Sequence, residues 1–334
     1  MTPLDGSTIA FVFPGQGSQK IGMGRAWTEA SAEARHAFEE ADEVLGFPLS
    51  RLCWEGPEEE LNLTVNTQPA LLATSVAIYR AVSPYLADAG VAPVAMAGHS
   101  LGEYSALVAA GSLSFADALR LVRLRGELMQ EAVPVGEGGM AAIIGMDPES
   151  ISALAADAAQ GEVCAVANLN GPGQTVIAGH KGAIDRAVAL AKERGARKAT
   201  VLAVSAPFHS PLMRPARNGM AGLLEATDFA DPSVPVVSNV DAVPVTTGAG
   251  ARDSLIRQID NPVRWVETVL WMSDSAGVHR FLEIGPGSVL AGLNRRIAPA
   301  TISSATGDPE QLRKLLDPGT AEPAPESGGK EKEA

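Results

Sequence analysis

The residues Gly98-His99-Ser100-Leu101-Gly102 form a G-x-S-x-G pattern between two segments of different expected structure. The apolar run at 91–97 predicts a buried strand, and the run at 103–110 predicts a helix. In this context the serine lies on a sharp strand-to-helix turn that exposes its hydroxyl. The free N–H groups and the positive dipole end of the new helix face any negative charge that develops there. We therefore expect Ser100 to be a nucleophile, the alternative being an ordinary strand–loop–helix turn.

A serine nucleophile needs a general base at neutral pH. The chain has five histidines, and three of them have unfavourable expected surroundings. His36 lies in a charged helix and His180 in a turn before a helix. His99 lies on the nucleophile turn itself, where its ring should point away from the hydroxyl. His209 lies in the loop Ala206-Pro207-Phe208-His209-Ser210-Pro211, which two prolines stiffen. We expect His209 to be the base, with His279, just before a predicted strand, as the alternative.

The third member of a catalytic triad is not evident in the sequence. In α/β-hydrolases an acid lies between the serine and the histidine along the chain, but most acids between Ser100 and His209 fall on a predicted insert or on polar helix faces. Asp241 follows His209 and would restore the order only with His279. We expect a backbone carbonyl to orient the histidine, an arrangement that favours a transferase over a hydrolase.

Arg125 interrupts the apolar face of a helix that opens with the capping pattern Ser114-Phe115-Ala116-Asp117. The apolar positions on this face are spaced three or four apart: Ala118, Leu121, Val122, Leu128 and Met129. A buried guanidinium without a partner costs about 3–5 kcal/mol, and its planar fork matches a carboxylate. We expect Arg125 to bind the free carboxylate of an acyl donor. The alternative is a buried salt bridge to an acid such as Glu283.

An oxyanion hole requires two N–H donors near the nucleophile. The backbone N–H of Leu101, directly after Ser100, is one expected donor. The other is expected from Gln16, in the turn Pro14-Gly15-Gln16-Gly17-Ser18-Gln19 that ends the first predicted strand. The alternative is that this segment is only a glycine-rich turn.

Predicted strands and helices alternate along the chain, which indicates an α/β fold with a mostly parallel sheet. The expected core strands lie at 8–13, 91–97 and 234–237, with a further strand-like run at 280–287. The expected core helices lie at 31–45, 68–86, 215–226 and 253–259, besides the helix that opens at Ser114. The segment between them predicts the β-α-β-β-α-β order that is typical of a ferredoxin-like unit, with elements at 140–145, 148–159, 163–168, 175–178, 183–194 and 199–204.

This pattern predicts a catalytic core of residues 1–138 and 206–316 and an inserted ferredoxin-like subdomain of residues 139–205. The subdomain should form one wall of a cleft above Ser100. Residues 317–334 are rich in Pro, Gly, Glu and Lys, and we expect a disordered tail there.

Composition narrows the possible classes of function. The 334 residues carry a net charge of −13, which argues against nucleic-acid or anionic-membrane binding by the whole surface. No run approaches the ~18 consecutive apolar residues of a membrane span, and two distant cysteines fit a reducing cytoplasm. No metal-ligand cluster or dinucleotide fingerprint is apparent, so we expect no metal and no cofactor.

Taken together, the motifs resemble the malonyl-CoA:acyl carrier protein transacylases, a family shared with acyltransferase domains of polyketide and fatty-acid synthases. The resembling segments span about residues 8 to 305: Phe13-Pro14-Gly15-Gln16-Gly17-Ser18-Gln19, Asn66-Thr67-Gln68-Pro69-Ala70, Gly98 to Gly111, Arg123-Leu124-Arg125-Gly126, His209, Asn239-Val240-Asp241 and Glu283-Ile284-Gly285-Pro286-Gly287. The resemblance implies an α/β-hydrolase-like core with a ferredoxin-like subdomain.

The resemblance also implies roles for individual residues. Ser100 would be the nucleophile, His209 its base and Arg125 the ligand of the malonyl carboxylate, with the backbone N–H groups of Gln16 and Leu101 as the oxyanion hole. Gln258 matches the position whose main-chain carbonyl orients the histidine, and Gln68 matches a glutamine that lines the pocket. Phe208 matches the bulky ring of malonyl-selective relatives. Ala206-Pro207 departs from the commonest selectivity pattern.

The implied reaction is a ping-pong transfer from malonyl-CoA, through a malonyl-serine ester, to the phosphopantetheine thiol of acyl carrier protein. An acidic carrier requires a local basic patch on this acidic chain, for which Arg197-Lys198 and Arg295-Arg296 are candidates. We expect a cytoplasmic monomer. The competing hypotheses are a serine esterase or thioesterase, a polyketide-synthase acyltransferase and a catalytically silent carrier-docking module.

Overall fold

The computed structural model describes residues 8–204 and 206–316, so the tail predicted at 317–334 lies outside the described residues. The larger of its two sheets has six strands in the order β10-β9-β1-β2-β7-β8. The bounds are β1 Ile9–Phe13, β2 Pro93–Gly98, β7 Val236–Val237, β8 Pro244–Val245, β9 Arg280–Glu283 and β10 Ile302–Ala305. Only the β7–β8 pair is antiparallel among these strands. The predicted α/β fold with a mostly parallel sheet is confirmed.

Strand β1 lies at the centre of this sheet and is buried along its whole length. It pairs in parallel with β2 and β9, in a register that places Phe13 opposite Gly98 and Val12 opposite Glu283. The carboxyl ends of the three strands therefore meet at one edge of the sheet, where ligands bind in open α/β folds. The loops that follow them are in close contact, because a Cβ on Gly15 would lie 2.3 Å from the carbonyl oxygen of His99.

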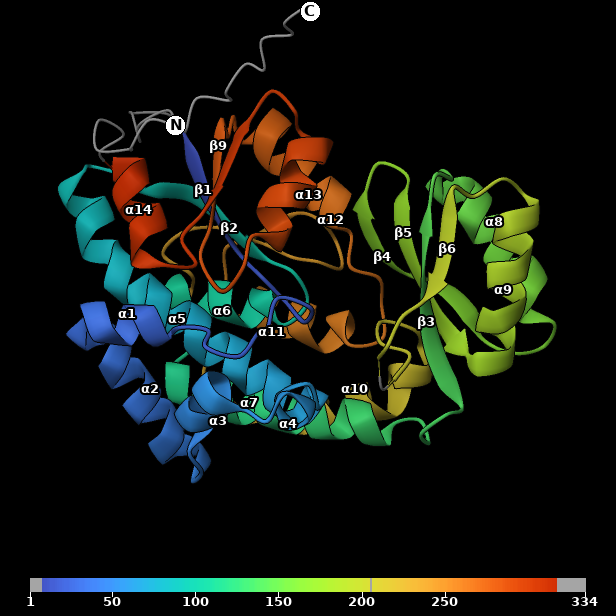
Figure 1. Ribbon diagram of the computed structural model, residues 1–334, viewed down its shortest axis with the longest axis horizontal. Coiled ribbons are helices and arrows are strands. Elements are labelled where there is room, and N and C mark those ends of the chain that lie inside the picture. The colour runs from blue at the N-terminus through green and yellow to red at the C-terminus, as the bar shows by residue number, and fades with distance from the viewer. Residues whose placement is uncertain (1–7, 205, 317–334) are drawn as a thin grey trace, which may run out of the picture.

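Alternate side chains of β1 belong to two apolar layers. Phe11 and Phe13 pack with helices α2 (Ala32–Leu45), α5 (Thr64–Asp88), α6 (Gly102–Ala109) and α7 (Phe115–Glu131). Ala10 and Val12 pack with α12 (Trp265–Leu270) and α13 (Val289–Ile297) on the opposite face. This two-sided burial explains why the strand reads as a continuous apolar run. Figure 1 shows helices on both sides of the strands β1, β2 and β9.

Helix α5 has 25 residues and contains the predicted helix at 68–86. Among the described helices it alone is long and apolar enough, by length and composition, to cross a membrane. Its most apolar window is 67% buried inside the protein, and the core helix of a soluble protein passes the same test. The residues that make α5 apolar are those that pack against the sheet and against α2 and α7.

A second sheet lies at the right of Figure 1, with the order β4-β5-β3-β6 and antiparallel pairing throughout. Its strands are β3 Gly138–Ile144, β4 Cys164–Gly171, β5 Gln174–His180 and β6 Lys198–Val201, and α8 (Pro148–Ala159) and α9 (Lys181–Glu193) cover one face. This is the expected ferredoxin-like order. Its edge strand β4 is joined to the rest of the protein, since Leu169 N donates to Val263 O and Val263 N to Ala167 O, both at 2.9 Å.

Several elements, most of them short, were not predicted from the sequence. They are α1 (Arg25–Ala30), α3 (Leu49–Glu55), α4 (Glu58–Leu61), the 3-10 helix Pro211–Met213, α12, the π-helical turn Trp271–Ser275, α13, α14 (Pro309–Leu316), β8 and β10. Most contain only one or two turns or a few strand residues, which is too short for a clear hydrophobic period. Helices α10 (Arg214–Ala226) and α11 (Gly248–Gln258) were predicted, although α11 begins earlier than expected.

The close packing around the start of α6 predicts the effect of adding one methyl group. A Cβ on Gly102 would lie 2.1 Å from the Phe13 carbonyl oxygen, so we expect Gly102→Ala to lower the free energy of unfolding by about 3 kcal/mol. Gly222→Ala is the matched control, because Gly222 lies in α10 with nothing within 4 Å of its Cβ position. Urea denaturation of both variants tests this, and equal stabilities would contradict it.

Candidate active site

Ser100 lies at the turn between β2 and α6 with a left-handed backbone, φ 51°. A Cβ on Gly98 would lie 1.9 Å from the backbone of Gly102, so both glycines of the G-x-S-x-G pattern are required by close backbone packing. Asn239 holds the turn through its side chain, whose Oδ1 accepts from Ser100 N at 2.6 Å and whose Nδ2 donates to Gly98 O at 2.7 Å. The strained serine is thus fixed from two sides.

The structure brings Ser100 and His209 together, with Ser100 Oγ 2.7 Å from His209 Nε2. The other ring nitrogen, Nδ1, lies 3.0 Å from the backbone carbonyl oxygen of Gln258. A carbonyl can only accept, so Nδ1 carries the proton and Nε2 accepts from the serine hydroxyl. Burial and the positive charge of Arg125 lower the pKa of His209 to about 3. The ring is therefore neutral and free to accept a proton.

The alternatives to this pair are not supported by the geometry. His279 precedes β9 and its backbone N–H donates to Thr8 O, at the edge of the sheet opposite Ser100. Asp241 is held in a two-pronged ion pair by Arg257, at 2.6 and 2.8 Å. His99, as expected, is directed elsewhere, because its Nε2 lies 2.8 Å from Asn170 Oδ1. Within the part of the chain that the structure describes, a backbone carbonyl and not an acid lies beside the His209 ring.

Arg125 is buried beside the serine, where its Nη2 donates to Ser100 Oγ at 3.0 Å and to Gln258 Oε1 at 2.9 Å. Its Nη1 donates to Gln68 Oε1 at 2.6 Å, and its Nε has no hydrogen-bond partner among the described residues. No carboxylate within residues 8–204 and 206–316 makes an ion pair with it. The alternative partner Glu283 instead accepts from the first backbone N–H groups of α13, those of Leu290 and Ala291.

Gln258 contacts more of the active-site residues than any other side chain described above. Besides its carbonyl at His209 and its Oε1 at Arg125, its Nε2 donates to Ser100 O at 2.9 Å and to Glu103 Oε2 at 2.8 Å. The resemblance implied a role only for the main-chain carbonyl. The side chain, which joins the serine turn to Arg125, was missed.

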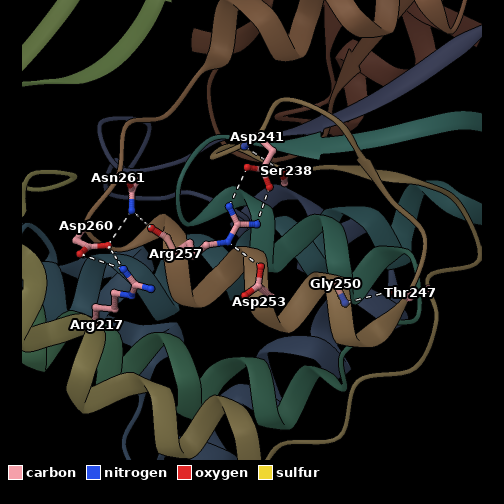
Figure 2. Close-up of polar contacts among 9 residues, drawn as sticks. All are labelled: Arg217, Ser238, Asp241, Thr247, Gly250, Asp253, Arg257, Asp260 and Asn261. Atoms are coloured by element: carbon pink, nitrogen blue, oxygen red, sulfur yellow. Dashed lines mark hydrogen bonds and ion pairs between the residues drawn. The ribbon is translucent and has the colours of Figure 1, made fainter.

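The end of α11 that carries Gln258 is anchored on both sides (Figure 2). Arg257 pairs with Asp241 and Asp253. Asp260 is nearly fully buried and accepts from Arg217 at 3.3 Å and from Asn261 at 2.9 Å. Arg217 belongs to α10, which follows the His209 loop, so these pairs join the histidine loop to the carbonyl that orients the ring.

Glu103 was also missed by the sequence analysis. Its Oε2 accepts from Gln258 Nε2 at 2.8 Å and from Asn239 N at 3.0 Å. Burial raises its pKa to about 7, against the lowering effect of these hydrogen bonds. The signal was available, because Glu103 is a carboxylate in α6, a short and otherwise largely apolar helix. Like Arg125, Glu103 is a charged residue among apolar ones in its helix.

A pocket of about 170 Å³ opens above Ser100. Its polar end is formed by Ser100, His209 and Arg125, and it is lined further by Gln16, Gln68, His99, Met129, Met140, Asn168, Asn170, Val176, Leu202, Val204 and Phe208. Strands β3, β4 and β5 supply Met140, the two asparagines and Val176, so the second sheet forms one wall, as predicted. Among the described residues, no acceptor takes the backbone N–H of Gln16 or Leu101.

The four candidate docking residues lie apart from this polar end. Arg197 and Lys198 are both exposed, immediately before and at the start of β6. Arg295 and Arg296 are exposed in the last turn of α13. The two pairs of basic residues therefore lie on different elements, one beside β6 and the other on α13.

Comparison with known proteins places this site in a family. Residues 10–307 match the family described as "Acyl transferase domain", and the chain belongs to that family. The chain is 50% identical over 309 residues to a malonyl CoA-acyl carrier protein transacylase of Escherichia coli, covering 92% of this chain and 99% of the relative. It is 49% identical over 311 residues to the enzyme of that description from Bacillus subtilis, covering 93% and 96%.

Solved structures give the same result. An acyl carrier protein S-malonyltransferase from Vibrio cholerae superposes with a TM-score of 0.88 at 50% identity, covering 92% of this chain and all of the other. A malonyl-transacylase in complex with a type II polyketide-synthase acyl-carrier protein superposes with a TM-score of 0.89 at 50% identity, covering 93% and 99%.

The depressed pKa of His209 predicts a measurable titration. An unfolded histidine titrates near 6.5, whereas we expect the His209 ring signal in NMR spectra of the native protein to remain that of a neutral imidazole down to pH 5. The folded-state pKa is the lower one, so this group's contribution to stability is present above about pH 6.5 and is lost as the pH falls toward 3. A His209→Gln variant assigns the signal, and a midpoint near 6.5 would contradict the prediction.

Proposed function

We propose that this protein is an acyl-carrier-protein S-malonyltransferase that uses Ser100, His209 and Arg125. The observation that carries the proposal is a buried guanidinium, unpaired with any carboxylate of the described residues, that touches the hydroxyl of a serine already bonded to a neutral histidine. A malonyl group presents a thioester carbon for the serine and, at its other end, a carboxylate for the arginine. The family and the names of the relatives support the same activity.

In the proposed mechanism Ser100 Oγ attacks the thioester carbonyl of malonyl-CoA while its proton passes to His209 Nε2. The C–S bond then breaks, the proton passes to the coenzyme A thiolate, and a malonyl-serine ester remains. The phosphopantetheine thiol of acyl carrier protein gives its proton to His209 and attacks this ester. Malonyl-thioester forms, the C–O bond breaks and the proton returns to Ser100.

The remaining residues support these two steps. The backbone N–H groups of Gln16 and Leu101 are proposed to stabilise the oxyanion, which fits their lack of an acceptor among the described residues. The Gln258 carbonyl keeps the His209 ring oriented, and Gln68 holds Arg125. Phe208 lines the pocket, where its ring would crowd a 2-methyl group and so favour malonyl over methylmalonyl.

The carrier protein is proposed to dock through Arg197 and Lys198 or through Arg295 and Arg296, whose exposed positive charges would meet the acidic carrier. No metal or cofactor takes part in the proposed chemistry. We propose that the enzyme acts as a monomer in the cytoplasm, in fatty-acid or polyketide synthesis.

The direct test of the function is intact-protein mass spectrometry after incubation with malonyl-CoA. We expect the mass of one malonyl group to be added to wild type, to be absent in Ser100→Ala, and to disappear when holo-acyl carrier protein is supplied. Acetyl-CoA and methylmalonyl-CoA serve as comparison donors. Steady release of coenzyme A without an adduct would instead identify a hydrolase, and neither adduct nor release would leave the docking-module hypothesis.

The role of Arg125 makes a separate prediction. Truncation of one partner of a buried charge pair costs 2–5 kcal/mol, so we expect Arg125→Ala to reduce kcat/KM for malonyl-CoA by about 100-fold. Hydrolysis of a neutral ester such as p-nitrophenyl acetate should fall far less, because that substrate has no carboxylate. Equal losses for both substrates would show that Arg125 serves the serine and not the acyl group.

A further inference from the structure

The buried positive charge of Arg125 has no directly bonded counter-charge among the described residues. Its hydrogen-bonding partners are two amide oxygens and one hydroxyl, from Gln68, Gln258 and Ser100. Tyr104, whose ring lies 5.8 Å from the guanidinium, is kept neutral because burial raises its pKa to about 12. Burying a cation without a compensating charge costs free energy, so a negative group nearby is expected to offset it.

Glu103 is the carboxylate connected to Arg125 through one intervening side chain. The amide of Gln258 lies between them, with its oxygen toward Arg125 at 2.9 Å and its nitrogen toward Glu103 Oε2 at 2.8 Å. Glu103 and Arg125 are both almost completely buried, so solvent screens their interaction weakly. The other acid near Glu103, Asp241, is already neutralised by Arg257.

The orientation of the Gln258 amide follows from this arrangement. Above its pKa of about 7 the Glu103 carboxylate is ionised and can only accept hydrogen bonds, so it requires the NH₂ of Gln258 on its side. The amide oxygen is thereby directed toward Arg125. A reversed amide would place the NH₂ of Gln258 against the N–H groups of Arg125, which are also donors. It would place the amide oxygen against the Glu103 carboxylate, which is also an acceptor.

We infer that Glu103 is a specificity-determining residue: as the indirect counter-charge of Arg125, it limits how strongly the pocket attracts the carboxylate of the acyl donor. This inference rests on the proposed function. With Glu103 in place, the incoming carboxylate meets a cation that is already partly compensated. Without it, the full charge of Arg125 acts on the donor. Glu103 touches neither donor nor serine hydroxyl and acts through Gln258 and Arg125.

The substitution Glu103→Gln tests the inference with little change in shape. The amide oxygen of the new side chain can still accept from Gln258 Nε2 and Asn239 N, so the hydrogen bonds persist while the charge is lost. At pH 8, above the pKa of about 7 of Glu103, we expect the ratio of kcat/KM for malonyl-CoA to kcat/KM for acetyl-CoA to rise by about tenfold, the order expected for a unit charge acting across one side chain at a protein's effective dielectric. General damage to the serine or histidine would lower both values together and leave the ratio unchanged.

Glu283→Gln is the matched control. Glu283 is also a fully buried carboxylate whose pKa burial raises to about 7, but it caps α13 instead of contacting Gln258. We expect its substitution to leave the ratio at the wild-type value. Glu103→Met, which removes the charge with an apolar side chain of similar size, provides the same ratio test if Glu103→Gln does not fold.

The outcomes separate this inference from the proposed function. A wild-type enzyme that transfers malonyl groups, with a ratio in Glu103→Gln that is unchanged or lower, would overturn the role of Glu103 alone. An equal rise in Glu283→Gln would do so too. A wild-type enzyme that accepts no malonyl group would refute the proposed function itself.

Discussion

The close approach of backbone segments at the nucleophile turn is the constraint on which the rest of the site depends. Strand β1 ends against the first residue of α6, with only a glycine hydrogen between the Phe13 carbonyl and that helix. This contact fixes where Ser100 stands, and Asn239 fixes its backbone from the other side. The histidine, the arginine and the Gln258 amide are all arranged around that one point. A looser turn would move the hydroxyl relative to all three at once.

The sequence predicted the parts of the site that have a local signature. Ser100 was recognisable from two glycines and the strand and helix beside it, and Arg125 from its place on an apolar helix face. His209 was chosen among five because prolines stiffen its loop, and the structure puts its ring 2.7 Å from the serine. The Gln258 side chain has no such signature, since a glutamine near a helix end is common. Its importance comes from contacts with residues far away along the chain.

The same distinction applies to the fold. Long or fully buried elements, such as β1 and α2, have clear apolar patterns and were predicted close to their observed bounds, and the start of α7 was predicted from its capping pattern. The short helices α1, α3 and α4 and the edge strand β10 have too few residues to show a period, and packing against larger elements determines them. The order of the second sheet was predictable from the succession of its elements. The backbone bonds between Leu169 and Val263 were not, because they join residues without any pairing signal.

Those bonds between β4 and the segment at Val263 have a mechanical consequence. They fasten β4, which supplies Asn168 and Asn170 to one wall of the pocket, to the segment at Val263 by main-chain groups, with no side chain that could rotate away. Widening the pocket would require rupture of backbone hydrogen bonds and exposure of the buried Val263. On the β4 side the pocket is therefore bounded by a frame of backbone hydrogen bonds, and more room there has to come from trimming the side chains that line it.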